Sequence, residues 1–447
     1  MKRNIILMPL IILSILFIGF LLYSKFVYPP IPSITKVGLV DNKIEVQFDI
    51  DKNNINNDVY CIITKNIFPD ANDNNWSLSK NNKCLFNIDK DSYTVYLKNK
   101  NNEIIEVSET SKLGKVINIE TNKNKVYLPI NGIYHPTLTI DTIGYIGENV
   151  KWISSNPDVV SVDNDGTIKA LKKGNSIIKA TLKDKDVSIE VISTNLITLK
   201  PNKFNNNKKY LTCGNYTKED NDLLDEILKD RLNDVGFKTR ASTVEAARFI
   251  TLEFPYKIRY FSENGRLTYA SKIDGEGRYY HEGLYLHSSR FKSLAKSNQG
   301  PKTWGCKMYS KPSHGIRRNG FDCSGFISWV LLNGGFDVGD LGAGVSAGVK
   351  DLTDVGKKTR FTSSLIKNGK VKVGDLLSSK GPSGGHIAII VGEDDNNYYV
   401  AESLWYEPYI GVVIVGYSKK TIYNRYYWIM LMDSVYKEDG KLTKMWY

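Results

Sequence analysis

Cysteine and histidine are both scarce in this chain, which holds five of each among its 447 residues. Five cysteines are too few for a disulfide scaffold, and an odd number leaves at least one thiol without a partner inside the chain. Neither residue type recurs at the spacing of a metal site, so no metal and no other cofactor is predicted. The cysteines are Cys61, Cys84, Cys213, Cys306 and Cys323.

Acidic residues are in the minority, with 48 Asp and Glu against 60 Lys and Arg, which leaves a net charge of +12. A basic protein suits polyanions such as nucleic acid, anionic lipid or the polymers of a bacterial wall, and charge alone does not choose among them. The composition, 41% hydrophobic and 24% charged, excludes a mostly disordered chain and a polytopic membrane protein.

Only one long apolar run is present, over residues 5–23, directly after the basic residues Lys2 and Arg3. It is about long enough to cross ~30 Å of hydrocarbon, and the charges before it keep the N-terminus inside. A cleaved signal peptide is the alternative, but no small-residue cleavage pattern and no lipobox cysteine follow. We expect residues 1–32 to be a signal anchor and a Pro-rich spacer of a single-pass cell-membrane protein. Export excludes nucleic acid as the expected partner and leaves wall polymers and the membrane.

Residues 33–110 alternate apolar and polar side chains in short runs between clusters of Asn, Asp and Lys. Residues 44–48 and 93–97 are examples, and no helical period appears. The pattern predicts a small Ig-like β-sandwich. Cys61 and Cys84 lie in two of its apolar runs, so a disulfide between them is expected in an exported protein, with two free thiols as the alternative.

Residues 113–195 continue with short strand patterns separated by Asn-Pro, Asp-Gly and Lys-Gly turns. The segments WISSNPDVVSV at 152–162, DGTIKA at 165–170 and KKGNSIIKA at 172–180 resemble a group 2 bacterial Ig-like domain. The resemblance implies a stalk or binding module without catalysis. Trp152 is interpreted as a core residue.

Residues 213–447 carry helix signals first and strand signals later, which predicts an α+β domain. Thr217 begins an amphipathic helix that Gly236 ends. Ser242 is interpreted as the cap of a second helix that stops before Pro255.

A nearly all-apolar run over residues 323–333 follows Asp322 and ends at Gly334, which predicts a buried helix with Cys323 at its N-terminal end. The helix dipole and the free N–H groups there favour a thiolate and could hold an oxyanion. A buried structural thiol is the alternative.

A thiol nucleophile needs a nearby base, usually histidine. His386 opens a buried strand pattern after two glycines, where a structural role is the alternative to a catalytic one. His135 lies among the predicted β-sandwich residues. The other three are interpreted as surface, interface or loop residues: His281, His287 and His314.

Taken together, four segments resemble the NlpC family of papain-like cysteine hydrolases, which cut the peptide stems of bacterial cell walls. They are GPKTWGC at 300–306, FDCSGF at 321–326, VGDL at 373–376 and GHIAIIVG at 385–392. The resemblance covers roughly the last third of the chain. It implies that Cys323 is the nucleophile and His386 the general base, and that Asp322 and Ser324 line the cleft for the stem peptide. The first motif would add Lys302 and Trp304 to the substrate-binding residues.

The chain departs from the family pattern at two places. Lys302 stands where the family usually has a tyrosine that faces the substrate. The strand pattern after His386 holds none of the residues that usually orient the histidine, and Glu402 is its best polar candidate. A register that pairs even with even positions would put both side chains on one face, where a carboxylate can hold an imidazole. An ordinary strand glutamate is the alternative.

Two cysteines have no partner that the sequence predicts. Cys306 replaces a glycine of the first motif and is interpreted as free or structural, and Cys213 has no clear partner. The expected function is that of an exported cysteine peptidase that hydrolyses amide bonds in peptidoglycan stems and binds peptidoglycan and anionic wall polymers. The alternatives are a wall-binding or adhesion protein with an inactive hydrolase-like domain, and an acyltransferase that uses the same Cys–His pair.

Overall fold

The computed structural model describes residues 33–40, 43–49, 58–65, 67–87, 93–109, 114–144, 146–261, 304–311, 315–318, 320–338, 341, 351–381 and 384–447. The expected anchor at 1–32 lies outside the described residues, and so do Lys302, His281, His287 and His314. Within these ranges no helix combines the length and the apolar character needed to cross a membrane. The chain divides into two compact units, one mostly before residue 193 and one mostly after it, and each is described by itself.

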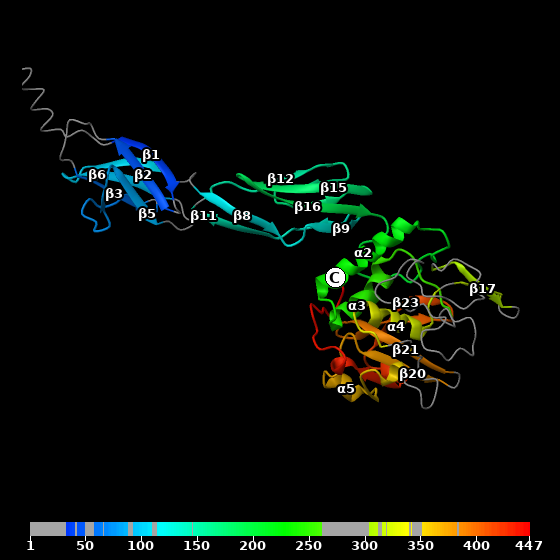
Figure 1. Ribbon diagram of the computed structural model, residues 1–447. Coiled ribbons are helices and arrows are strands. Elements are labelled where there is room, and N and C mark those ends of the chain that lie inside the picture. Colours follow the sequence, from blue (N-terminus) through cyan, green and yellow to red (C-terminus); the bar gives the residue numbers. More distant parts are fainter. Residues whose placement is uncertain are drawn as a thin grey trace, which may run out of the picture. The chain divides into compact units, whose positions relative to one another are not determined.

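The first part of the N-terminal unit is a sandwich of two antiparallel sheets (Figure 1). One sheet has the order β1 (Ser33–Val40), β2 (Lys43–Asp49), β5 (Lys83–Asn87), and the other has the order β4 (Ser77–Leu78), β3 (Val59–Thr64), β6 (Thr94–Asn99), β7 (Ile104–Glu109). Alternate residues of β2, such as Val46, meet alternate residues of β6, such as Val95, in one buried core. The predicted sandwich is therefore present. The predicted disulfide between Cys61 on β3 and Cys84 on β5 is confirmed and joins the two sheets.

The second part of this unit is also built of antiparallel strands. Its sheets have the orders β11–β8, β10–β14–β13 and β12–β15–β16–β9. The strands are β8 (Lys115–Thr121), β9 (Lys125–Pro129), β10 (Ile133–Tyr134), β11 (Leu138–Ile143), β12 (Lys151–Ser154), β13 (Val160–Val162), β14 (Ile168–Ala170), β15 (Gly174–Leu182) and β16 (Lys185–Thr194). Trp152 packs against the core that holds Val116 and Ala180, as predicted. Gly166 has φ +88°, and a Cβ there would lie 2.6 Å from the Trp152 ring, so the turn needs glycine.

The C-terminal unit begins with two consecutive helices, α2 (Lys218–Val235) and α3 (Arg240–Arg248), and a π-helix, η1 (Phe249–Glu253). Thr217 caps α2 through a capping box and Gly236 ends it, as the sequence predicted. The second cap was assigned wrongly. Thr239 caps α3. Ser242 is the third residue of that helix, and its hydroxyl accepts a hydrogen bond from the Thr239 N–H. Ser and Thr three residues apart can each start such a box, which is why the sequence was ambiguous.

The sheet of this unit has six antiparallel strands in the order β19–β24–β20–β21–β22–β23. They are β19 (Lys357–Arg360), β20 (Leu376–Gly381), β21 (Gly384–Glu393), β22 (Asn397–Leu404), β23 (Gly411–Ser418) and β24 (Trp428–Leu431). The other elements after α3 are the hairpin β17 (Lys307–Lys311) and β18 (Gly315–Arg318), the helices α4 (Cys323–Asn333), α5 (Ser363–Lys367) and α6 (Ile422–Arg425), and the short 3-10 turns η3 (Leu352–Asp354) and η4 (Met432–Ser434). Helix α4 contacts α3, β21 and β22 (Figure 1). Helices α2, α3 and α4 precede the six-stranded sheet along the chain, whereas the short helices α5 and α6 lie between its strands.

The VGDL motif at 373–376 has a structural use. Asp375 is buried and binds Arg240, whose side chain is fully buried, with 3.0 Å between Oδ1 and Nη1. The Met432 N–H also donates to Asp375 Oδ1, at 3.0 Å. Gly374 has φ +95°, and a Cβ there would lie 2.8 Å from Arg240 Cγ. The motif therefore joins α3, the start of β20 and the segment after β24.

Candidate active site

Cys323 is the first residue of α4, and the residues on both sides of it fix the start of that helix. Asp322 is the N-cap and accepts a hydrogen bond from the Gly325 N–H at 2.6 Å. The Ser324 hydroxyl donates to the same Asp322 oxygen at 2.9 Å. Both side chains are buried. Their geometry explains a rigid helix start, and their contact with substrate stays a prediction.

The Cys323 thiol is partly exposed and is the only one of the five cysteines outside a disulfide. Its Sγ lies 4.0 Å from the Gly385 carbonyl oxygen at the beginning of β21. A thiol at a helix N-terminus, open to solvent on one side, is in the setting in which reactive cysteines occur.

His386 and Glu402 meet on neighbouring strands in the way that the sequence predicted. Ile390 pairs with Val400 and Ile389 with Ala401, so even positions pair with even. His386 Nε2 and Glu402 Oε2 are 2.7 Å apart. Glu402 is fully buried, which separates it from an ordinary solvent-facing strand glutamate.

The imidazole of His386 interacts on both sides. Burial lowers its pKa, but hydrogen bonds with Cys323 and Glu402 and the charges of these groups outweigh burial and raise the pKa to about 9. Because Nε2 faces Glu402, Nδ1 is the nitrogen that remains for the interaction with Cys323. In the described ranges no group of three or more His, Cys, Asp or Glu residues is placed to hold a metal ion.

Three further residues surround the Glu402 carboxylate, and sequence reasoning missed all of them. The Tyr417 hydroxyl donates to Oε1 at 2.7 Å, and the Tyr426 hydroxyl donates to Oε2 at 2.8 Å. Arg425 Nη2 lies 3.8 Å from Oε2. Burial raises the pKa of Glu402, but the bond and charge of His386 and the two tyrosine hydroxyls lower it overall. The parity of the strand register could have placed Tyr417 on the Glu402 face, whereas nothing in the sequence indicated Tyr426.

Tyr260 is a second residue that sequence reasoning missed. It pairs with Phe321, and burial together with the nearby Asp322 and Cys323 raises the pKa of its hydroxyl. Tyr260 lies in the segment after η1, far from Cys323 along the chain, so no local pattern indicated that the two are close.

Trp304, which was predicted to contact substrate, is a core residue. It is 2% exposed and packs edge-on against Phe321 at 5.2 Å and against Trp329 at 5.9 Å between ring centroids. The prediction is corrected: its side chain supports the helix behind Cys323. A Trp in a motif near an active site does not reveal from sequence which way it points.

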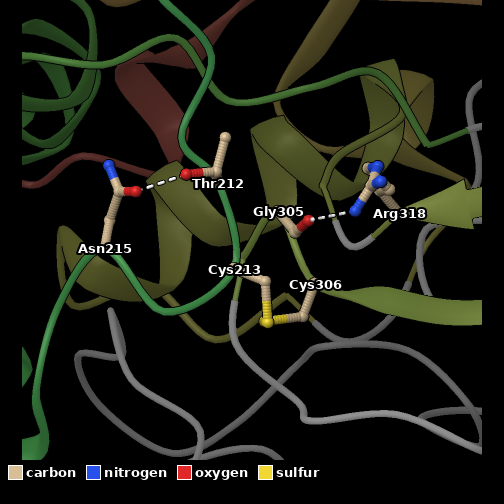
Figure 2. The surroundings of a disulfide bond; sticks show 6 residues. All are labelled: Thr212, Cys213, Asn215, Gly305, Cys306 and Arg318. Atoms are coloured by element: carbon tan, nitrogen blue, oxygen red, sulfur yellow. Dashed lines mark hydrogen bonds between the residues drawn. A yellow bond between two sulfur atoms is a disulfide. The ribbon is translucent and has the colours of Figure 1, made fainter.

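Cys213 and Cys306 form a disulfide, which corrects the interpretation that Cys213 lacks a partner (Figure 2). The bond joins the segment before α2 to the segment that leads into β17. Gly305 has φ +80°, and a Cβ there would lie 2.3 Å from the Leu211 carbonyl oxygen, so the two segments meet backbone to backbone. Their separation of 93 residues left no local signal for the pair. The disulfide holds the segment that carries Trp304.

Comparison with known proteins identifies one part of the chain. Residues 141–191 match the family of bacterial Ig-like domains (group 2). No curated protein matches. A termite-gut GH10 xylanase with a bacterial Ig-like domain is 20% identical over 25% of this chain and 23% of its own, with a TM-score of 0.14. Domains 4 and 5 of the S-layer protein SbsC are 17% identical over 25% of this chain and 69% of their own, with a TM-score of 0.17.

Invasin, a bacterial integrin-binding protein, is 10% identical over 39% of this chain and 40% of its own, with a TM-score of 0.20. This chain therefore spans about a quarter of the xylanase and less than half of invasin. Scores this low carry no argument about function. A group 2 bacterial Ig-like domain occupies residues 141–191, inside the range 113–195 for which the sequence predicted one.

Proposed function

We propose that this chain is an exported cysteine peptidase that hydrolyses amide bonds in the peptide stems of bacterial peptidoglycan. The observation that carries the proposal is the array of Cys323, His386 and Glu402. A thiol at a helix N-terminus, a histidine beside it and a buried carboxylate behind the histidine are the nucleophile, base and orienting group of covalent amide hydrolysis. A nucleophile helix packed on an antiparallel sheet that bears the histidine agrees with a papain-like domain of the NlpC type.

The proposed reaction begins when the Cys323 thiol gives its proton to His386. With a pKa near 9, His386 keeps this proton at neutral pH. The thiolate then attacks the carbonyl carbon of the stem amide. Because Asp322 already binds the Gly325 N–H, the donors proposed for the oxyanion are the N–H groups of Cys323 and Ser324.

Collapse of the tetrahedral intermediate breaks the C–N bond. His386 gives its proton to the leaving amine, and the acyl group remains on Cys323 as a thioester. His386 Nδ1 next takes a proton from water, which attacks the thioester. The peptide acid leaves, and the proton returns to the thiol–imidazole pair.

The substrate class rests on three features of the chain. The four NlpC-like motifs lie in the order of that family, the net charge of +12 suits anionic wall polymers, and an Ig-like module of a bacterial group precedes the catalytic unit. We further propose that the apolar run at 5–23 anchors the chain in the cell membrane with the catalytic unit outside.

Mass spectrometry of purified wall incubated with the full-length protein tests the proposal. Hydrolysis predicts stem fragments with a new amine and a new carboxylate. An amine adduct in place of water would identify an acyltransferase. Wall that binds the protein but yields no fragments would support the alternative of a wall-binding protein and overturn the peptidase proposal.

A further inference from the structure

The Glu402 carboxylate lies in a fully enclosed site, yet both of its oxygens receive hydrogen bonds. Oε1 accepts from Tyr417, and Oε2 accepts from Tyr426 and faces His386 Nε2, all within 2.7–2.8 Å. The residue is 0% exposed. An ionised carboxylate is costly to bury unless donors replace the water that it loses. Three donors around two oxygens meet that need.

The two tyrosines serve as donors over the whole working pH range. Burial is the largest cause that raises the pKa of each hydroxyl, and the charge of Glu402 raises it further, so both stay protonated. A hydroxyl that donates to a carboxylate stabilises the anion more than the neutral acid, because charge-assisted hydrogen bonds are the stronger kind. The two tyrosine hydroxyls thereby also orient the carboxylate.

We propose that Tyr417 and Tyr426 are positioning residues, whose hydroxyls keep Glu402 ionised and aimed at His386 Nε2 so that Nδ1 remains for Cys323. The tyrosines come from two places in the fold. Tyr417 lies near the end of β23, and Tyr426 directly follows α6. The Tyr426 ring also lies nearly parallel to the imidazole of His386, at an angle of 26° and a centroid distance of 6.4 Å.

The charged and titratable groups that face this pair come from several elements. Arg425 of α6 lies with Cζ 5.1 Å from the centre of the Tyr417 ring and 5.6 Å from that of Tyr426. Its Nη2 also donates to the Tyr406 hydroxyl at 2.6 Å. Among the residues that the structure describes, those around the imidazole and the carboxylate are Cys323 of α4, Glu402 of β22, Tyr417 of β23, Arg425 and Tyr426, with Asp322 and Tyr260 beside Cys323.

The test is a pH titration of the His386 ring by NMR on the full-length protein labelled with ¹⁵N-histidine. With five histidines in the chain, the His386 signals are those lost in His386→Gln. They should shift twice, near pH 9 when His386 loses its proton and below pH 4.5 when Glu402 gains one. A parent protein whose acid-side midpoint is at or above 4.5 would overturn the proposal without any variant.

The single variants Tyr417→Phe and Tyr426→Phe should each move the acid-side midpoint upward by roughly one pH unit, because each loses one charge-assisted hydrogen bond. The midpoint near 9 should move much less, since Glu402 is ionised on both sides of it. The matched control is Tyr436→Phe, a buried tyrosine whose hydroxyl donates to the Gly374 carbonyl at 3.2 Å. It should leave both midpoints in place. Equal shifts in the control, or no shift in the two variants, would refute the positioning role.

The inference rests on the proposed function only for the identity of the reaction, and the titration uses no wall substrate. If wall digestion fails while the acid-side midpoint moves as stated, the positioning role stands and the substrate assignment falls. If digestion succeeds and the midpoint does not move, the peptidase stands and the two tyrosines are only core residues.

Discussion

The sulfur of Cys323 lies 4.0 Å from the carbonyl oxygen of Gly385, the residue directly before His386. The first turn of α4 and the first residues of β21 are therefore in contact beside Cys323 and His386. The distance between the proposed nucleophile and the proposed base is then set by the backbone packing of a helix on a sheet. Substitutions elsewhere in the core should therefore affect the site through these two elements.

Substitutions at Glu402 should separate charge from shape. Glu402→Gln keeps an acceptor for His386 but removes the negative charge, whereas Glu402→Ala also leaves the Tyr417 and Tyr426 hydroxyls buried without their partner. We expect the order parent, Gln, Ala in the rate of wall hydrolysis. The loss for Ala should reach up to ~10⁴-fold, as for orienting carboxylates in triads.

The pH–rate profile of the Glu402→Gln variant should show in which direction the charge of Glu402 shifts the pKa of His386. In the parent, hydrolysis should fall as pH rises through about 9, because protonated His386 must donate to the leaving amine. The charge of Glu402 raises the pKa of His386, so its removal should move this alkaline limb to lower pH. Equal rates for parent and Glu402→Ala at every pH would show that Glu402 has no part in the reaction.

Stability should also depend on the protonation of His386. Its pKa in the folded protein, about 9, lies above the ordinary 6.5, so the folded state binds its proton more tightly. The stability that the folded protein gains from binding this proton is fully present below pH 6.5 and is lost as pH rises through about 9. The free energy of unfolding of the parent minus that of His386→Gln should decrease over this window. The difference cancels groups common to both proteins, such as Lys208, whose pKa burial lowers to about 8.

Loss of the Cys213–Cys306 disulfide should destabilise the C-terminal unit. A bond that closes 93 residues removes loop entropy from the unfolded chain worth about 4–5 kcal/mol. Cys213→Ser and Cys306→Ser should therefore lose similar stability in urea unfolding, and each should expose a second free thiol. Cys61→Ser is the matched control, since its bond lies in the N-terminal unit. An unchanged urea midpoint in both variants would contradict a structural role for the bond.

Trp304 and Trp405 provide a contrasting pair. Trp304 is 2% exposed behind α4, and Trp405 is 70% exposed. Trp304→Ala should cost about 3–5 kcal/mol of stability and slow the alkylation of Cys323, because the support of the helix start is lost. Trp405→Ala should change stability by no more than about 0.5 kcal/mol. If Trp304→Ala lost as little stability as Trp405→Ala and left the alkylation rate of Cys323 unchanged, the packing behind α4 would not matter to the site.

Local patterns predicted the parts of this protein that depend on neighbouring residues. The alternation at 44–48 predicted strand β2, and the apolar run after Asp322 predicted helix α4. The even-with-even pairing of β21 and β22 predicted that His386 and Glu402 lie together. Periodicity and caps act over a few residues, so a sequence displays them directly.

Apart from the cap of α3 and from Tyr417, which local patterns could have placed, the missed features depend on contacts between distant segments. Cys213 pairs with a residue 93 positions away, and Tyr260 reaches Cys323 from before α4. Tyr426 approaches Glu402 from beyond β23. Trp304 lies in one of the four NlpC-like motifs, but its side chain packs in the core. Motif position indicates which segment builds a site, and only packing decides which side chains of that segment face it.

Release of new amino groups from purified wall by the full-length protein and by Cys323→Ala tests the central claim most directly. Cys323 is the only free thiol, so iodoacetamide treatment of the parent is a second, chemical way to remove the same nucleophile. We expect the parent to release amines steadily, and Cys323→Ala and the alkylated parent to release none while their unfolding midpoints stay close to that of the parent. Undiminished release by Cys323→Ala would contradict the assignment of the nucleophile and, with it, the proposed mechanism.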